Sequence, residues 1–310
     1  LGARGEILVN EQLRTSVPDI YALGDAATVT NLVSGARQVI PLAGPANKQA
    51  RIVADVICGK NAAYKGSIGT SVMKFFDMTV AAAGEKEESL RAAGTAYRKS
   101  YTVSASHAGY YPGGTQMFVK LLYNPEGRVL GAQIVGGEGV DKRIDALAIA
   151  IRFGMTVYDL EEMELAYAPP FSSAKDPVNM AGFVAQNVLE GGVELFYAED
   201  VDSLPEDAVK LDVRNPEELA ELGEIPGFVN IPLNQLRQRL DEIDLTRPVY
   251  VTCQVGLRGY VAARILAQKG AKVYDLSGGY AFYNARRTDL AGRADRGGNT
   301  CAACGMQVTR

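Results

Sequence analysis

The stretch that most constrains the fold of this chain is Val249–Gly270, VYVTCQVGLRGYVAARILAQKG. Its first four residues, Val249–Thr252, are β-branched or aromatic and predict a short buried strand that ends at a cysteine. Gly259–Lys269 predicts a helix, because apolar residues recur at helical spacing and Gly270 supplies a stop signal. The residues between them therefore form a loop that joins the end of a strand to the start of a helix.

This loop, Cys253–Arg258 (CQVGLR), has the properties of a site for an anionic sulfur. Backbone N–H groups in such a loop point inward, and the helix dipole adds partial positive charge. We therefore expect the pKa of the Cys253 thiol to fall, with Arg258 adding a fixed positive charge over the same cavity. The same cradle suits a persulfide anion, and the other residues expected to line it are Gln254, Val255, Gly256, Leu257 and Gly259.

The loop resembles the active loop of rhodanese-type sulfurtransferases, and its flanks agree with that family. Upstream, Lys210–Pro216 (KLDVRNP) and Gly223–Leu233 (GEIPGFVNIPL) match the family's "DVR" strand and "GxIPGAxNIP" segment. Downstream, Val273–Tyr283 (VYDLSGGYAFY) matches its "LxGGxxxW" close, with Tyr283 where tryptophan is usual. The resemblance implies a rhodanese-like α/β domain with a parallel sheet over residues 193–290.

The length of the loop separates two kinds of chemistry. Four residues lie between Cys253 and Arg258, as in the sulfurtransferases, whereas related phosphatases use five and admit a tetrahedral phosphate. Sulfur transfer is therefore favoured over phosphatase or arsenate-reductase-like chemistry on the same loop. Cys253 could also be an inert buried cysteine, and the chain could be a non-catalytic dimerisation and binding module. We also expect Asp212 and Arg214 of the "DVR" strand to form a buried pair that organises the loop.

Composition excludes several classes of function. A length of 310 residues suggests two or three domains, and a net charge of -4 gives no basic footprint for nucleic acid. No apolar run reaches the roughly 18 residues of a membrane helix. Four cysteines do not make a disulfide framework, so a reducing cytoplasm fits. The single histidine, His107, rules out a multi-histidine metal site within one chain and is expected at a turn or interface, so we predict no metal.

The N-terminal segment, GARGEILVNEQLRTSVPDIYALGDAA, predicts strands at Ile7–Val9 and Ile20–Leu23, the second ending at Gly24-Asp25. Asp25 alone could equally be a helix N-cap. The segment resembles the "TSxPxIYAxGD" motif of FAD-containing pyridine nucleotide-disulfide reductases, which implies that Asp25 hydrogen-bonds the ribityl chain of the flavin. Pro41–Arg51 (PLAGPANKQAR) matches the helix start that faces the isoalloxazine, and the residues implied there are Pro45 and Ala46.

That family begins with a strand–GxGxxG–helix for the FAD pyrophosphate, followed by a redox cysteine and a second GxGxxG domain for the nicotinamide nucleotide. The sequence contains none of these, and its nearest glycine cluster, GGEGVD at residues 136–141, has the wrong spacing. Residues 1–64 therefore resemble the C-terminal piece of an FAD-binding domain. We expect that this chain alone does not hold FAD stably, although the resemblance implies FAD and NAD(P)H in the intact enzyme.

Residues 65–192 form a second unit of mixed pattern. Strands are predicted at Met117–Tyr123 and Val129–Val135 around a turn, and a helix is predicted at Val140–Phe153, where apolar residues occupy one face. The α+β pattern resembles the dimerisation domain of the same reductases, which implies a homodimer.

The segment Tyr167–Asn179 (YAPPFSSAKDPVN) narrows the resemblance to coenzyme A disulfide reductases and their NADH oxidase and persulfide reductase relatives. These enzymes use two tyrosines of the partner subunit near the redox cysteine and its thiol leaving group. The matching positions are Tyr167 and one of Tyr110 or Tyr111, between which the sequence does not decide. A phenol can donate a hydrogen bond to a leaving thiolate. Each tyrosine could instead be a half-buried core residue.

Residues 291–310 are predicted to be a flexible tail, in which Cys301 and Cys304 form a CxxC. One CxxC is weak evidence for zinc. Ala303–Gln307 resembles the opening of small TusA-type sulfur-carrier domains, so the tail could be the start of one that is truncated. As a whole, the chain resembles the C-terminal part of a coenzyme A disulfide or persulfide reductase fused to a rhodanese domain. The resemblance implies sulfane sulfur transfer through a Cys253 persulfide, a coenzyme A substrate and a possible sulfur-carrier partner.

Overall fold

The computed structural model describes residues 1–295 of the chain, with side chains up to residue 292. The predicted CxxC of Cys301 and Cys304 lies outside the described residues. The chain forms two compact units, the first made of Leu1–Lys99 and Ala105–Phe183 and the second of Ser100–Ser104 and the residues from Val184 onward. Within the described part, no helix combines the length and hydrophobicity needed to cross a membrane.

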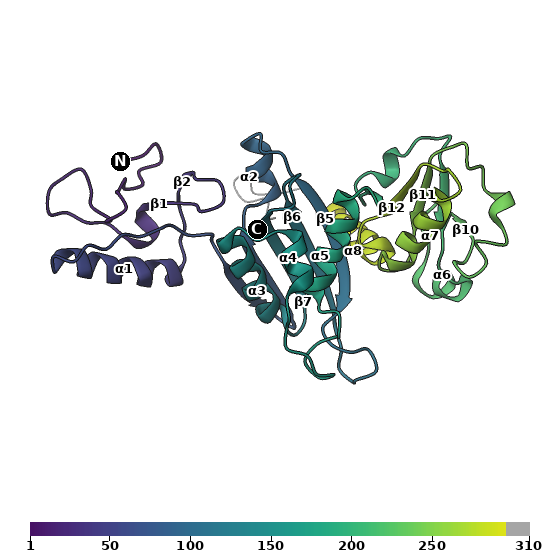
Figure 1. Cartoon of the computed structure of the whole chain (residues 1–310), viewed down its shortest axis with the longest axis horizontal. Helices are drawn as coiled ribbons and strands as arrows, with labels where there is room; N and C mark the ends of the chain where they lie inside the picture. The colour runs from purple at the N-terminus through teal and green to yellow at the C-terminus, as the bar shows by residue number, and fades with distance from the viewer. Residues whose placement is uncertain (296–310) are drawn as a thin grey trace. The chain divides into compact units, whose positions relative to one another are not determined.

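The N-terminal segment contains little regular structure before its helix (Figure 1). The elements are η1 (Gly24–Ala26), β1 (Thr28–Thr30), β2 (Arg37–Val39) and α1 (Ala43–Ile57). The predicted strands at Ile7–Val9 and Ile20–Leu23 are wrong: these stretches make only the isolated bridges Ile7–Ala27 and Arg14–Tyr21. A strand requires a partner along its length, and these two segments have only bridging contacts.

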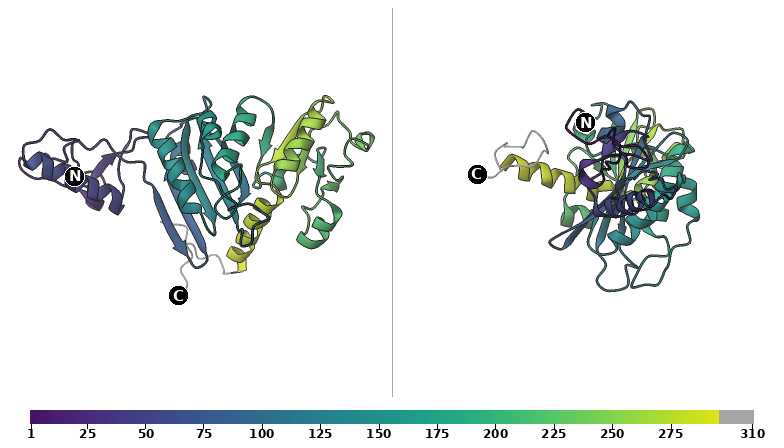
Figure 2. Two further views of the ribbon diagram at one scale, coloured as in Figure 1. Left: turned by 60° about the horizontal axis from the view of Figure 1, so that its bottom comes forward. Right: turned by 90° about the vertical axis from the view of Figure 1, so that its left-hand side faces the viewer.

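A five-stranded sheet lies mostly in the first unit, with Ser100–Ser104 of its edge strand assigned to the second unit. Its strand order is β3-β4-β7-β6-β5, and the pairs β3–β4, β4–β7 and β6–β7 are antiparallel. The strands are β3 (Ser71–Phe75), β4 (Met78–Gly84), β5 (Arg98–Ala105), β6 (Gln116–Tyr123) and β7 (Val129–Gly136). Helix α3 (Val140–Phe153) packs on β4 and β7, and Figures 1 and 2 show it against one face of the sheet. The remaining helices are α2 (Glu87–Ala92), α4 (Val157–Glu162) and α5 (Pro177–Leu189), the last of which continues into the second unit.

The second unit is built on a parallel sheet with strand order β10-β9-β11-β12-β8. The strands are β8 (Glu194–Phe196), β9 (Val209–Asp212), β10 (Val229–Asn230), β11 (Val249–Thr252) and β12 (Val273–Leu276). The helices are α6 (Pro216–Leu222), α7 (Leu257–Ala267) and α8 (Gly279–Asp295), with short 3-10 turns η2 (Val201–Ser203) and η3 (Leu240–Glu242). Because the central strand β11 carries the loop, Cys253 lies at the carboxyl edge of a buried sheet.

The predicted fold class is confirmed, with α+β structure in the first unit and a parallel α/β sheet in the second. Strand Val249–Thr252 and helix Val140–Phe153 have the predicted bounds. The helix predicted at Gly259–Lys269 begins earlier, at Leu257, because Gly256 already serves as its N-cap. The loop that precedes it is therefore shorter than the sequence pattern suggests.

Candidate functional site

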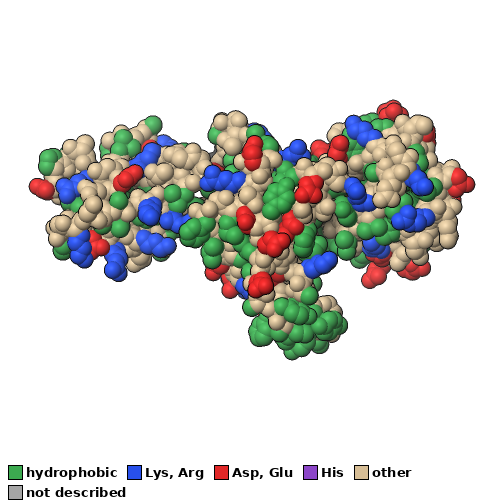
Figure 3. Space-filling model, in the orientation of Figure 1, with side chains coloured by type: hydrophobic (Ala, Val, Ile, Leu, Met, Phe, Trp, Pro, Cys, Tyr) green, Lys and Arg blue, Asp and Glu red, His purple; other side chains and the backbone are tan. Residues whose placement is uncertain are grey.

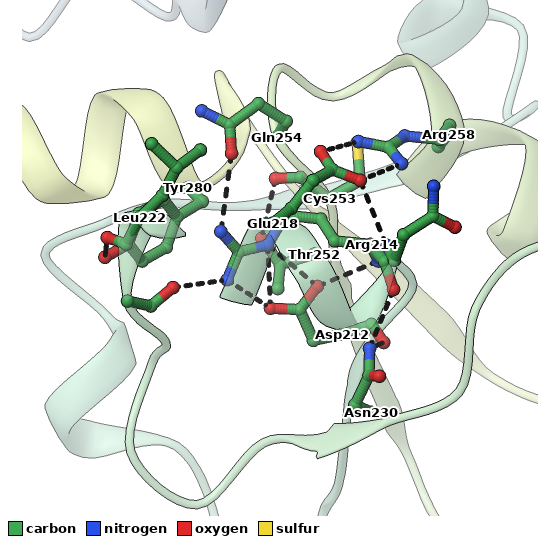
Figure 4. A network of polar contacts seen from close by, with 12 residues as sticks. Asp212, Arg214, Glu218, Leu222, Asn230, Thr252, Cys253, Gln254, Arg258 and Tyr280 are labelled. Atoms are coloured by element: carbon green, nitrogen blue, oxygen red, sulfur yellow. Dashed lines mark hydrogen bonds and ion pairs between the residues drawn. The ribbon is translucent and has the colours of Figure 1, made fainter. Parts of the chain in front are cut away.

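The Cys253 loop surrounds a buried thiol with backbone donors, and Figure 4 shows Cys253 near the paired side chains of Arg258 and Glu218. Cys253 follows β11 directly and is 1% exposed. The N–H of Gly256 donates to its Sγ at 3.2 Å, and the N–H groups of Val255 and Gly259 also act on the sulfur and lower its pKa. These donors belong to the first turn of α7 and the loop before it, so the predicted cradle of inward N–H groups is present.

The start of α8 closes the other side of this loop. The N–H of Tyr280 donates to the carbonyl of Cys253 at 2.8 Å, and that of Ala281 donates to the carbonyl of Gln254 at 3.0 Å. Gly279, which precedes them, has φ of +61°, and a Cβ there would lie 2.6 Å from the Cys253 carbonyl oxygen. Only glycine fits this approach. The Gly278-Gly279 pair therefore fixes the backbone that holds the thiol.

Arg258 is paired with a carboxylate that the sequence analysis did not single out. Its guanidinium donates two hydrogen bonds to Glu218 of α6, at 2.6 and 2.5 Å. The hydrogen bond from Arg258 lowers the pKa of Glu218, which therefore carries its negative charge at neutral pH. Glu218 also accepts from the N–H of Asn215 in a capping box, a signal that the spacing Asn-Pro-Glu-Glu contains. The positive charge over the loop is therefore compensated.

The buried pair predicted in the "DVR" segment is confirmed. Arg214 and Asp212 are 0% and 1% exposed, and Nη2 of Arg214 lies 2.7 Å from Oδ2 of Asp212. The guanidinium also donates to the carbonyl of Gly223 at 2.9 Å and to Oε1 of Gln254 at 3.4 Å, and it lies 4.0 Å from the centre of the Tyr280 ring. Arg214 thus connects β9, the Cys253 loop and α8 (Figure 4).

The predicted fall in the pKa of Cys253 is wrong for this structure. Burial raises the pKa of the thiol, and the negative charge of Asp275 on β12 raises it further. The loop N–H groups act in the opposite direction but do not outweigh these two effects. The expectation failed because it counted the charge of Arg258 without its partner Glu218 and did not anticipate Asp275.

In the first unit, the structure brings Tyr167 together with Tyr110. Their hydroxyl oxygens lie 3.4 Å apart, and this hydrogen bond raises the pKa of Tyr167. Tyr111 instead packs edge-on against the buried ring of His107, with 5.6 Å between ring centres. The loops that carry these tyrosines protrude at the bottom of Figure 1, and hydrophobic side chains gather there in Figure 3. Tyr110 is 77% exposed, so this apolar tip is uncovered in the single chain.

A buried arginine holds the two tyrosine loops together. Arg143 of α3 is ion-paired with Asp176, with Nη2 and Oδ2 2.9 Å apart, and both side chains are almost fully buried. The same guanidinium donates to the carbonyls of Ser106 and Phe171, one in each loop. Arg143 therefore attaches the chain between β5 and β6 to the chain that precedes α5, and the N–H of Ala108 adds hydrogen bonds to the carbonyls of Pro169 and Ser172. No local sequence pattern marks Arg143, because its partners in the two loops are distant in sequence.

The residues predicted to hold the flavin lie beside one another. The N–H of Gly24 in η1 donates to Oε1 of Gln49 at 2.7 Å, which sets η1 against the first turns of α1. Asp25 is exposed, and α1 starts without a side-chain cap, two residues before Pro45 and three before Ala46. A carboxylate next to an uncapped helix N-terminus fits a hydroxyl-bearing, negatively charged ligand. Among the described residues there is no group of three or more His, Cys, Asp and Glu side chains that could hold a metal.

Three family models match the chain in succession. The pyridine nucleotide-disulphide oxidoreductase model matches residues 1–50, the dimerisation domain of those enzymes matches residues 70–177, and the rhodanese-like domain matches residues 197–286. The chain therefore combines two segments that match models of pyridine nucleotide-disulphide oxidoreductases with one segment that matches the rhodanese-like domain. Cys253 and Arg258 lie in the rhodanese-like domain, and the tyrosines lie in the dimerisation domain.

Individual relatives have names that agree with this succession of domains. Coenzyme A disulfide reductase of Staphylococcus haemolyticus is 41% identical over 190 residues, which are 61% of this chain and 43% of that protein. The structure of reduced Bacillus anthracis CoADR-RHD is 47% identical with a TM-score of 0.89, covering 93% of this chain and 52% of that one. The structure of an NAD-dependent persulfide reductase from A. fulgidus is 42% identical with a TM-score of 0.83, and the match covers 91% of this chain and 51% of that one. The chain thus spans about half the length of these relatives.

Proposed function

We propose that this chain is part of an FAD- and NAD(P)H-dependent coenzyme A disulfide or coenzyme A persulfide reductase whose rhodanese-like domain transfers sulfane sulfur through a persulfide on Cys253. The observation that carries the proposal is the Cys253 loop, where a buried thiol receives a backbone N–H bond at 3.2 Å. The relatives named as coenzyme A disulfide and persulfide reductases support the substrate class.

The loop performs nucleophilic catalysis with a thiolate. The thiolate of Cys253 attacks the outer sulfur of a persulfide donor, the donor's S–S bond breaks, and its thiolate leaves. The new S–S bond makes Cys253 a persulfide, whose negative charge the N–H groups of Val255, Gly256 and Gly259 stabilise. A second thiol then takes the outer sulfur, and this acceptor is a small-molecule thiol or a sulfur-carrier protein. Because the reaction needs a free thiol, the proposed compartment is the reducing cytoplasm.

Tyr110 and Tyr167 are proposed to act at the reductase centre of a homodimer. Their hydroxyl groups lie together on an exposed apolar tip, which is the arrangement expected of side chains that function against a second subunit. A phenol there donates a hydrogen bond to the thiolate that leaves when a coenzyme A disulfide is cleaved. The structure favours Tyr110 over Tyr111 for this role, since Tyr111 contacts His107 instead.

Part of the flavin site is proposed at the start of α1. In a complete flavin site, Asp25 would accept a hydrogen bond from a ribityl hydroxyl, and the uncapped N–H groups next to Pro45 and Ala46 would stabilise negative charge on the flavin. Gly24 keeps η1 close to α1. A bound flavin supplies electron transfer from the nicotinamide nucleotide. The proposed domain boundaries are residues 1–64 for this FAD-binding piece, 65–192 for the dimerisation domain and 193–290 for the rhodanese-like domain.

The proposal is tested by sulfur loading of the full chain. The chain is incubated with coenzyme A persulfide, and intact peptides are weighed by mass spectrometry. We expect the peptide with Cys253 to gain one sulfur atom, and Cys253→Ser to abolish this gain. Cys58→Ser is the matched control, because Cys58 is an exposed free cysteine outside the rhodanese-like domain and its replacement should leave loading unchanged.

Two results contradict the proposal. One is a Cys253 peptide that gains no sulfur from any persulfide or thiosulfate donor while the chain is folded. The other is hydrolysis of a phosphoester that depends on Cys253, which would assign the loop to phosphate chemistry. The four residues between Cys253 and Arg258 favour a sulfane sulfur substrate over a phosphoester.

A further inference from the structure

We propose that the buried carboxyl group of Asp275 controls the protonation of Cys253, because the two side chains share a single negative charge. The inference rests on the proposed function and deepens it, since it names the group that decides when the nucleophile is a thiolate. Asp275 acts through Cys253 and is therefore a positioning residue. Nothing in the loop motif itself points to it, as it lies on a different strand.

Strand register places Asp275 on the same side of the sheet as Cys253. In the parallel pair β11–β12, Asp275 lies opposite Val251, two residues before the cysteine. Paired residues of neighbouring strands project to the same face, and residues two apart on a strand do so as well. Val251 and Cys253 both belong to the core cluster packed under α7. The carboxyl group is therefore directed to the α7 side of the sheet, next to the loop.

Gly259 is the residue that both groups approach. Its N–H acts on the sulfur of Cys253, and a Cβ built on it would lie 2.1 Å from Oδ1 of Asp275. The carboxyl oxygen thus occupies the space that any larger residue at position 259 would need. Oδ1 is buried and has no hydrogen-bond partner among the described residues, and Asp275 is 4% exposed. A buried polar oxygen without a partner is costly and calls for a reason.

The ionisable groups around Asp275 leave it without a cation. From α7, Arg258 is paired with Glu218, the carbonyl of Gly192 accepts from Arg264, and Tyr260 donates to Asn187. The other ionisable groups on β8, β11, β12, α8 and the turn before β12 are Glu194, Tyr250, Lys272, Tyr274, Tyr280 and Tyr283. The four tyrosines belong to a different core cluster from Cys253. Within the described part of the chain, no lysine or arginine forms an ion pair with Asp275.

Two buried acids without a cation cannot both ionise easily. Burial raises the pKa of Asp275 well above its usual range, and the charge of Asp275 in turn raises the pKa of Cys253. When the thiolate forms, the S–H bond breaks and its proton is lost to solvent, while the Asp275 carboxyl keeps its own proton. Attack on a persulfide then forms one S–S bond and breaks another, with no net oxidation, and the donor's thiolate leaves. The thiolate therefore forms more readily while Asp275 is protonated.

The test is the pH profile of alkylation at Cys253 in the full chain. Iodoacetamide is the probe, and the modified Cys253 peptide is quantified by mass spectrometry across pH, so that the other thiols do not interfere. Asp275→Asn keeps the shape but removes the charge, and we expect it to lower the apparent pKa of Cys253 by about one unit or more. This raises the alkylation rate at pH 7.5 by about tenfold or more. Asp244→Asn is the matched control, because Asp244 is an exposed carboxylate of the same unit.

A change in apparent pKa below about 0.3 units, a rise in it, or an equal fall in the Asp244 control overturns the proposal. A second measurement uses the unmodified chain, so it does not depend on whether a variant folds. Infrared spectra of the unmodified chain should show a protonated carboxylic acid that persists above the pH at which exposed carboxyls have ionised. Its absence also overturns the proposal. Neither readout needs sulfur transfer, so a chain that shows both effects but accepts no sulfur contradicts the proposed function alone.

Discussion

The ion pair between Arg214 and Asp212 gives the sharpest prediction about what holds the Cys253 loop in place. Both side chains are buried, and Arg214 also donates to the carbonyl of Gly223. In Arg214→Met, the carboxylate of Asp212 stays charged and buried but loses its main partner. Removing one partner of a buried pair costs about 3–5 kcal/mol. Since about 1.4 kcal/mol is a factor of ten, opening of the second unit should become roughly a hundred to several thousand times more frequent.

The assay is hydrogen exchange of the full chain, followed by mass spectrometry of its peptides. Peptides that contain β9 and β11 should exchange faster by this factor, whereas peptides of β6 and β7 in the first unit serve as an internal control and should not change. Local exchange is preferred to a single unfolding curve, because a chain of two units need not unfold in one step.

Arg239→Met is the matched control variant. Arg239 forms an ion pair with Glu242 at 2.6 Å in the same unit, but the two side chains are 34% and 47% exposed. An exposed pair of this kind contributes no more than about 1 kcal/mol, so exchange of β9 and β11 should hardly change. The double variant with Asp212→Asn and Arg214→Met should lose less stability than Arg214→Met alone, because it leaves no buried charge unpaired. If Arg214→Met costs under about 1 kcal/mol, or no more than the control, the reasoning about burial is refuted.

Three further predictions concern single side chains. Tyr110→Phe should return the pKa of Tyr167 toward its ordinary value, whereas Tyr111→Phe should not, as a spectroscopic titration of the phenols will show. Burial raises the pKa of Glu87, but hydrogen bonds from two lysines outweigh this and lower it to about 2. Its carboxylate therefore stabilises the first unit above the unfolded-state pKa near about 4.3, and this contribution is lost as pH falls toward about 2. Glu87→Gln should remove this acid dependence from thermal unfolding. Gly279→Ala should displace the loop carbonyl that lies 2.6 Å from the new Cβ and should reduce sulfur loading of Cys253 by coenzyme A persulfide.

Local sequence predicted the elements that are buried and closely spaced in the chain. The run Val249–Thr252 forms a strand because its side chains are suited to a buried parallel sheet, and it lies between β9 and β12. The Asp212–Arg214 pair could be predicted since both residues lie at the end of one strand. In each case the information is carried by neighbouring residues, so it can be read without knowledge of the fold.

Predictions failed where packing decides over local preference. Residues 234–243 have the composition of a helix, but the structure has turns and only η3 there. Leu236 and Ile243 are instead buried in the core beside β11, and propensity is a weak prior against such packing. Glu218 and Asp275 were missed for a related reason, because each meets the loop from an element distant in sequence.

The charges that surround Cys253 balance one another, and this balance determines what can stabilise an anionic sulfur there. Arg214 is neutralised by Asp212, and Arg258 is neutralised by Glu218. The side chains therefore contribute little net positive charge, so the donors that remain for the sulfur are the backbone N–H groups of the loop. Backbone donors are fixed by the fold and do not titrate. It follows that the geometry of the loop, which Gly279 and the Arg214 contacts maintain, matters more for holding a persulfide than the presence of an arginine in the motif.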